Sequence, residues 1–325
     1  MKTRVTELLG IKYPIIQGAM GLVSDSPAVV CAVSDAGGMG ILAATDLSPE
    51  GMRENIRMIK ELSDKPFGVN ILPAHPEYVR MLEIMVEEEA PVMCHGRGNP
   101  WNLIKLAKSG KIMTLPTVGA VKHAIKAEAD GADAIIVTGT EGGGHTSYIG
   151  TMMLIPAVVD KVSIPVIAGG GIADPRQFVA ALALGAEGIE MGTRFMVTQE
   201  SPVHENVKQK LVEASEEEVW ATHQVTGRYQ RGLLNKFRRQ FLNEGPDHKG
   251  VIVDKLADKD YLAGLMTAVG KAFVDGDVED GSISCGQGVG LINDIPTIPD
   301  LIKRFVQEAE KIYEGMKTSI PKWSD

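Results

Sequence analysis

The chain has 325 residues, of which 44% are hydrophobic, enough to bury a large core in one domain or in one large and one small domain. It has 33 Lys and Arg against 42 Asp and Glu, a formal charge of −9, which argues against nucleic-acid binding because such binding needs a basic face. The N-terminus lacks the apolar stretch of a secretory signal, and no apolar run is long enough to span a membrane. We therefore expect a cytoplasmic protein that binds neither nucleic acid nor membrane.

The three cysteines, Cys31, Cys94 and Cys285, lie far apart and show no CxxC spacing. This pattern indicates neither a disulfide framework nor a zinc site, and no other metal site is expected. Cys94 and Cys285 are expected to be buried packing thiols, because no base or cluster of positive charge stands beside them in the sequence.

Eight short apolar segments divide the first 200 residues, and most are followed by a helical pattern. The expected strands are residues 13–17, 39–44, 67–72, 92–94, 112–117, 134–138, 165–168 and 188–191. They lack polar alternation, which is typical of a parallel sheet covered on both faces. Eight such units predict an α/β fold, a (β/α)₈ TIM barrel. An open, doubly wound sheet would have its glycine fingerprint after the first strand, where the sequence reads Gly18-Ala19-Met20-Gly21.

Glycine turns follow the seventh and eighth expected strands. They consist of Gly169, Gly170 and Gly171 in the first turn, and Gly192 with Thr193 in the second. Glycine lets backbone N–H groups approach a ligand, and the loops after strands 7 and 8 of a barrel commonly bind phosphate. A tight strand-to-helix turn would account for a single glycine run. Two glycine turns at adjacent strand ends favour a phosphate site.

A glycine-rich loop after the sixth expected strand ends at His145. Three glycines, 142–144, would let the loop lie against a flat ligand and direct one imidazole at it. Histidine is the side chain most easily used as an acid or base near neutral pH, so His145 is the expected catalytic residue. The alternative is a surface loop with an incidental histidine, which is how we interpret His75 and His95, in loops of no special character.

Two amides are weaker candidates. Asn70, at the end of the third expected strand, can donate to and accept from the edge of a heterocycle, or can simply cap the next turn. Gln287 depends on the glycine-rich stretch 275–291 folding back toward the site.

After Phe195 the strand–helix rhythm stops. Residues 202–277 are highly charged and are expected to be mostly helical, with helices at 203–214, 233–242 and 261–273 and an exposed turn at 244–250. We expect residues 1–200 with 286–325 to form the barrel, including a closing helix at 298–316, and residues 201–285 to form a small helical lid or substrate domain. The basic run 228–239 is either a solvated helix face or a site for a phosphorylated handle such as a phosphopantetheine thioester.

Six segments together resemble one known family. They are 17–20 (QGAM), 65–70 (KPFGVN), 141–145 (EGGGH), 169–171 (GGG), 191–195 (MGTRF) and 286–287 (GQ). Their order and spacing are similar to those of the nitronate monooxygenase family, formerly 2-nitropropane dioxygenases. That family also contains FMN-dependent enoyl-acyl-carrier-protein reductases and related CoA-thioester and quinone reductases.

The resemblance implies an FMN-containing barrel. It places phosphate contacts at Gly169, Gly170, Gly171, Gly192 and Thr193, the flavin ring against Gly18, Ala19, Met20 and Asn70, and His145 over the reactive face. Glu141, Met191 and Gln287 complete the expected cofactor-binding set. Ala19 departs from the family, where many members have a second glycine, and Thr146-Ser147-Tyr148 is not a family-wide pattern.

Several functions remain open. The first is oxidation of an alkyl nitronate with O₂. The alternatives are NAD(P)H-dependent reduction of an enoyl thioester of acyl carrier protein or CoA, NAD(P)H:quinone reduction and, outside enzymes, a sensor of a phosphate ligand. The substrate, the electron donor (substrate, NADH or NADPH) and the assembly, including a homodimer, are left open.

Overall fold

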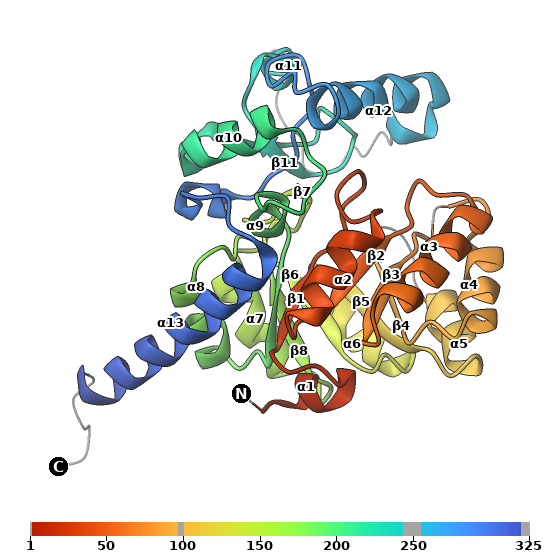
Figure 1. Cartoon of the computed structure of the whole chain (residues 1–325), viewed down its shortest axis with the longest axis vertical. Helices are drawn as coiled ribbons and strands as arrows, with labels where there is room; N and C mark the ends of the chain where they lie inside the picture. Colours follow the sequence, from red (N-terminus) through yellow and green to blue (C-terminus); the bar gives the residue numbers. More distant parts are fainter. Residues whose placement is uncertain (1, 74, 97–100, 243–254, 320–325) are drawn as a thin grey trace.

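The structure is a computed structural model that describes residues 2–73, 75–96, 101–242 and 255–319. Eight parallel strands form its barrel in the order β1-β9-β8-β6-β5-β4-β3-β2, and a bridge between Ile16 and Met39 joins β1 to the start of β2 (Figure 1). The (β/α)₈ prediction is confirmed. The barrel strands are β1 (Ile15–Gln17), β2 (Gly40–Ala43), β3 (Phe67–Asn70), β4 (Val92–His95), β5 (Met113–Val118), β6 (Ile135–Thr138), β8 (Val166–Gly169) and β9 (Gly188–Met191).

Helices surround the barrel, and local sequence explains where two of them begin. Ser48 caps α3 by accepting a hydrogen bond from Gly51 N at 3.1 Å, and Asp174 caps α8 in a capping box with Gln177. The helices of the barrel are α1 (Arg4–Leu9), α2 (Pro27–Asp35), α3 (Pro49–Leu62), α4 (Tyr78–Glu87), α5 (Trp101–Ser109), α6 (Val121–Ala129), α7 (Thr151–Val159), α8 (Pro175–Ala183) and the short α9 (Thr193–Met196).

Side chains of the barrel strands alternate between the interior and the helix-covered outside. Ile16 on β1 packs in the interior cluster with Val5 of α1, whereas its neighbour Ile15 packs outside with Phe305. On β9, Ile189 and Met191 belong to the outer cluster, which leaves Glu190 facing inward. The same alternation brings small and polar residues to the carboxyl ends of the strands, where the barrel opens.

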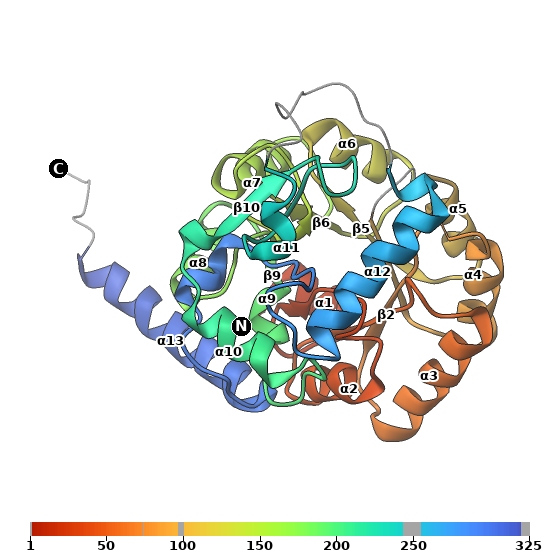
Figure 2. The same cartoon turned by 90° about the horizontal axis from the view of Figure 1, so that it is seen from above.

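The segment after α9 lies over that opening and contains strands as well as helices (Figure 2). Its elements are α10 (Glu205–Glu213), η1 (Glu216–Glu218), β10 (Val219–Thr222), β11 (Gln230–Leu233), α11 (Lys236–Arg239), η2 (Lys255–Ala257) and α12 (Lys259–Phe273). β10 and β11 pair antiparallel, and β7 (Gly144–His145), from the loop after β6, adds to β11. We call residues 201–285 the lid, as the sequence predicted its bounds; that division remains a prediction.

The predicted helix 233–242 is wrong in part, because Leu233 ends β11 and only Lys236–Arg239 are helical in α11. The antiparallel pair was missed because its strands are four residues long and become stable only against each other and β7. The turn expected at 244–250 lies outside the described residues.

One interpretation of the basic run 228–239 needs correction, and the other, a site for a phosphorylated handle, remains a prediction. Arg231 and Arg238 are buried, so the run is not a solvated helix face. Arg231 Nε donates to Thr140 O at 3.1 Å, and Arg238 Nη2 donates to Gln230 Oε1 at 3.0 Å. Lys236 pairs with Asp280. These cations hold the lid together and to the barrel, and Arg228 is the cation of this run that lines the cavity described below.

The C-terminal residues return to the barrel. After η3 (Gln287–Leu291), the long helix α13 (Ile298–Ser319) packs against α8 and α2 (Figure 1). Arg194, at the end of the MGTRF motif, is buried and donates through Nη2 to Asp294 O at 2.8 Å. This contact fixes the segment between η3 and α13 beside α9.

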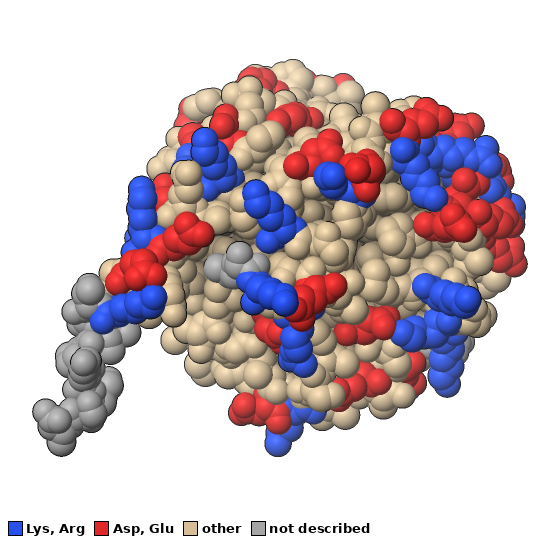
Figure 3. Space-filling view, turned by 60° about the horizontal axis from the view of Figure 1, so that its bottom comes forward, with Lys and Arg blue, Asp and Glu red and all other residues tan. Residues whose placement is uncertain are grey.

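The surface view of Figure 3 shows Lys and Arg interspersed with Asp and Glu over the face that it presents. Among the described residues, no helix combines the length and the apolar character of a membrane span.

His95 is not in a loop of no special character, as the sequence suggested. It ends β4, one residue beyond the predicted strand, and its side chain is fully buried. Neither ring nitrogen has a hydrogen-bond partner among the described residues, and burial lowers the pKa of the imidazole to about 3.

This shift predicts acid lability. Below pH 6.5 the His95 imidazole is protonated in the unfolded chain, whereas in the folded chain it stays neutral down to about pH 3. The free energy of unfolding therefore falls as the pH decreases. The slope from this one group reaches about 1.4 kcal/mol per pH unit. In denaturant titrations between pH 4 and 7, the free energy of unfolding of His95→Leu should fall less on acidification than that of the wild type. Parallel pH profiles for the two proteins would contradict this.

Candidate active site

A cavity of about 1040 Å³ lies between the mouth of the barrel and the lid. It gathers most of the predicted site at the carboxyl ends of the barrel strands. Gly18, Ala19, Met20, Asn70, His145, Gly170, Gly171, Gly192 and Thr193 line it. Gly169, Glu141, Met191 and Gln287 are not among the lining residues. The structure thus brings the two glycine turns, Asn70 and His145 to one place.

The two glycine turns differ in what they need glycine for. Gly170 and Gly171 have φ of 95° and 79°, and a Cβ on Gly170 would stand 2.8 Å from Gly139 N. Glycine is therefore required at both positions by the conformation and packing of the backbone itself. At Gly192, a Cβ would meet only Met20 Sδ, at 3.4 Å, and would point into the cavity. The room left at Gly192 beside the Gly170–Gly171 turn fits a terminal phosphate.

Glu141, Met191 and Gln287 support the wall rather than line it. The Glu141 carboxylate accepts from Thr151 N at 2.8 Å and Thr151 Oγ1 at 2.6 Å, at the start of α7. Its carbonyl oxygen accepts from Gln287 N at 2.9 Å, and Met191 O accepts from Gly18 N at 2.9 Å. Direct contacts of these three residues, and of Gly169, with a cofactor remain predictions.

The glycine-rich stretch 275–291 does fold back onto the site, as predicted. Gly286 N donates to Thr193 Oγ1 at 3.0 Å, and a Cβ on Gly143 would stand 2.6 Å from the carbonyl carbon of Cys285. Cys285 is fully buried, and burial raises the pKa of its thiol to about 12. Burial also raises the pKa of Cys94. Both are packing thiols, as expected, because neither forms a thiolate near neutral pH.

His145 is held over the cavity by the lid. In the β7–β11 pairing it stands opposite Gln230, and Gly144 stands opposite Arg231. The imidazole is half-buried, and its Nε2 lies 3.0 Å from Thr226 Oγ1. A half-buried imidazole oriented by a hydroxyl and facing a cavity is suited to proton transfer.

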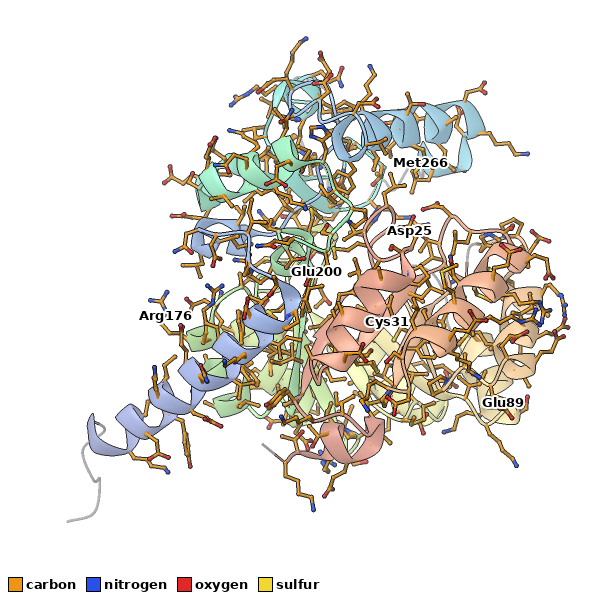
Figure 4. All side chains as sticks on the ribbon, viewed as in Figure 1. Asp25, Cys31, Glu89, Arg176, Glu200 and Met266 are labelled. Atoms are coloured by element: carbon orange, nitrogen blue, oxygen red, sulfur yellow. The ribbon has the colours of Figure 1, made fainter. Side chains whose placement is uncertain are left out.

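Sequence reasoning missed the outer walls of the cavity. On one side are three rings: the Tyr148 ring centroid lies 4.7 Å from that of Tyr229, and His223 lies 5.2 Å from Tyr229. On the other side α12 contributes Leu262 and Met266; Figure 4 shows Met266 on the face of α12 toward the barrel. No sequence signal marks these residues, because Tyr148 follows β7 and the others belong to the lid, and only the folded chain brings them together at the mouth.

Sequence reasoning also missed two polar groups deep in the cavity. Glu190, from β9, lines the cavity, and burial raises the pKa of its carboxyl to about 7. Thr138 Oγ1, from β6, is buried and has no hydrogen-bond partner among the described residues. A signal for Glu190 was present: it is an acid in the apolar strand GIEM, directly before a glycine turn.

A TIM barrel with glycine turns after its last two strands, and a histidine facing the same cavity, is the arrangement expected of a cofactor-dependent enzyme. Comparison with known proteins identifies which one. The sequence model of the nitronate monooxygenase family matches residues 2–79 and 72–308, so the chain belongs to that family.

Relatives span nearly the whole chain. A (3aS,4S,5R,7aS)-5-hydroxy-7a-methyl-1-oxo-octahydro-1H-indene-4-carboxyl-CoA dehydrogenase of Rhodococcus jostii is 34% identical, covering 97% of this chain and 98% of its own length. A probable nitronate monooxygenase of Staphylococcus aureus is 30% identical, covering 96% and 99%. The structure of FabK from Thermotoga maritima is 36% identical with a TM-score of 0.90, covering 98% and 100%.

The protein is therefore an oxidoreductase of a family of flavin enzymes. The non-catalytic sensor considered from the sequence is not retained.

The geometry at Gly192 yields a clean test of the phosphate cradle. If the phosphate binds at Gly192, Gly192→Val should weaken flavin binding strongly, because the new side chain would fill that space without meeting backbone. Gly170→Val cannot serve, since its positive φ and the contact with Gly139 would strain the fold itself. The measurement is the dissociation constant of flavin from refolded apoprotein.

Gly270→Val is the control, because a Cβ at this α12 position meets no atom within 4 Å. It should bind flavin as the wild type does. Equal affinities in Gly192→Val and the wild type would place the phosphate elsewhere.

Proposed function

We propose that the protein is an FMN-dependent oxidoreductase in which His145 handles the substrate proton. The observation that supports it is a single cavity with a glycine cradle on its barrel side and the His145 imidazole on its lid side. Space for one terminal phosphate beside Gly192, without a nucleotide fingerprint after β1, favours FMN over a dinucleotide.

When bound, FMN would accept or deliver two electrons at its ring. The residues of the chain have separate tasks. The Gly170–Gly171 turn, Gly192 and Thr193 would hold the phosphate, and Gly18–Met20 with Asn70 would support the ring. His145 would take a proton from the substrate carbon or give one to it, while Thr226 Oγ1 fixes the orientation of its imidazole. The lid would exclude water from the cavity.

Oxidation of an alkyl nitronate with O₂ is one substrate assignment. The family match and the S. aureus relative favour it, and it needs one proton-handling group beside the ring, which His145 supplies. A small nitronate would leave much of the cavity unfilled.

An acyl thioester is the second substrate assignment, and the volume of the cavity favours it. At about 1040 Å³ the cavity slightly exceeds the range of roughly 300–1,000 Å³ for single small-molecule sites, which suits FMN together with a large second ligand. The apolar side of α12 and the rings of Tyr148 and Tyr229 suit an acyl or ring-bearing substrate. The R. jostii relative is named for a CoA thioester. NADH or NADPH would then supply the electrons, with the acyl group on CoA or acyl carrier protein.

The flavin half-reactions distinguish these assignments. Purified protein should be yellow and release FMN, not FAD, on heating. Under anaerobic conditions, bleaching of the flavin by an alkyl nitronate alone supports the first assignment. Bleaching by NADH or NADPH, followed by reoxidation with an enoyl-CoA, supports the second. Protein that takes up no flavin when incubated with FMN would contradict the proposal as a whole.

The role of His145 is tested by His145→Ala. The variant should keep its fold and FMN but lose substrate turnover by about 10²–10⁴-fold, the usual effect of losing a positioned acid or base. With a nitronate, flavin reduction should slow. With an enoyl thioester, reduction by NAD(P)H should survive while reoxidation fails.

His123→Ala is the matched control, because His123 also lines the cavity but belongs to α6 and is exposed. It should retain near wild-type turnover. Full activity in His145→Ala would leave His145 a loop residue.

A further inference from the structure

Two polar side chains stand on either side of one glycine in the barrel interior. In the strand register Thr138 of β6 lies opposite Gly169 of β8, which lies opposite Glu190 of β9. A Cβ on Gly169 would be 3.1 Å from both Thr138 Oγ1 and Glu190 Oε2. A Cβ on Gly18, the residue after β1, would be 3.3 Å from Glu190 Cδ. The glycines thus leave room for the hydroxyl and the carboxyl to face the depth of the cavity.

Neither group is satisfied by the protein. Thr138 Oγ1 is buried without a partner, and Glu190 makes no hydrogen bond or ion pair within the described part of the chain. The side-chain amide of Gln17, the polar residue of β1, is already bonded to Gly18 O and to Ile41 N. A buried hydroxyl left unpaired is costly, so this oxygen and the unpaired carboxyl beside it point to a ligand with complementary polar atoms.

The surroundings of Glu190 contain few other titrating groups. The charge of Glu190 acts on Cys94 of β4, whose thiol stays protonated because burial raises its pKa. His145 on β7 lines the same cavity. The strands β1, β3, β6 and β8 present Gly18, Asn70, Thr138 and Gly169, which do not titrate. Because burial raises the pKa of Glu190 to about 7, its carboxyl changes protonation near neutral pH.

We propose that Glu190 and Thr138 bind the polar, pyrimidine edge of the flavin ring and that Glu190 takes up a proton when the ring is reduced. This rests on the proposed function, because it requires a bound flavin. Electrons added to the ring make a nearby carboxylate a stronger base, since like charges repel. Two electrons from the reductant therefore bring one proton from water onto the Glu190 carboxylate, and oxidation of the ring returns that proton.

The test is the midpoint potential of the bound flavin between pH 6 and 9. Above pH 7, the wild type should show one more proton taken up per two electrons than Glu190→Gln, which retains size and hydrogen bonding but does not titrate. One extra proton changes the ratio of oxidised to reduced flavin tenfold per pH unit. The midpoint potential of the wild type should therefore fall by about 30 mV more per pH unit than that of Glu190→Gln. Equal slopes in the two proteins would overturn the assignment of Glu190.

Thr138→Val provides an independent measurement that does not depend on the folding of Glu190→Gln. It is nearly isosteric and removes the unpartnered oxygen. If that oxygen bonds the flavin, the dissociation constant should rise by about 2- to 13-fold, the net effect of one hydrogen bond, with no loss of stability in the apoprotein. An unchanged dissociation constant would overturn the role of Thr138.

The outcomes separate this inference from the function on which it rests. A wild type that binds no flavin contradicts both. Flavin binding with equal potential slopes contradicts only the inference and leaves the roles of the glycine cradle and His145 untouched.

Discussion

The pairing of β7 with β11 is the contact on which the site depends. Gly144 and His145 belong to a loop of the barrel, yet their backbone is part of the lid's antiparallel sheet. Arg231, on β11, also donates to Thr140 O in the same loop. Because one short strand is shared, the histidine is fixed relative to the cradle only when the lid is folded onto the barrel. A lid that moved away would carry the imidazole with it.

The glycines of the site serve two physical purposes. Gly143 and Gly171 permit segments of the protein to approach each other, since a Cβ would stand 2.6 Å from the carbonyl carbon of Cys285 or 2.7 Å from Glu141 Cβ. Gly192 instead leaves room in the cavity. A row of glycines in a sequence does not reveal this division. It matters because a substitution of the first kind damages the fold, whereas one of the second kind reports on the ligand.

Burial acts with opposite sign on two ionisable groups of the barrel strands, His95 and Glu190. It makes His95 neutral by lowering its pKa and makes Glu190 neutral at mildly acidic pH by raising its pKa. His95 is not among the residues that line the described cavity, so we expect its effect to be on stability. Glu190 lines the cavity, so its proton is available to a ligand. The position of each group along its strand, inward or outward, decides between these consequences.

The sequence by itself predicted the barrel: apolar strands without alternation are typical of a parallel sheet covered by helices, and eight such units with no glycine fingerprint after the first strand favour a closed barrel over an open sheet. It also determined the glycine turns and His145, because the carboxyl ends of parallel strands meet at one rim wherever the strands are placed. Tertiary structure alone decided the small sheet of the lid and the burial of its arginines. Strands as short as Val219–Thr222 have no stability of their own, and the charged run at 228–239 gave no sign that Arg231 and Arg238 would be buried. It also decided the pairing of Thr138 with Glu190 across Gly169, since register between distant strands is set by packing of the whole barrel and not by local sequence.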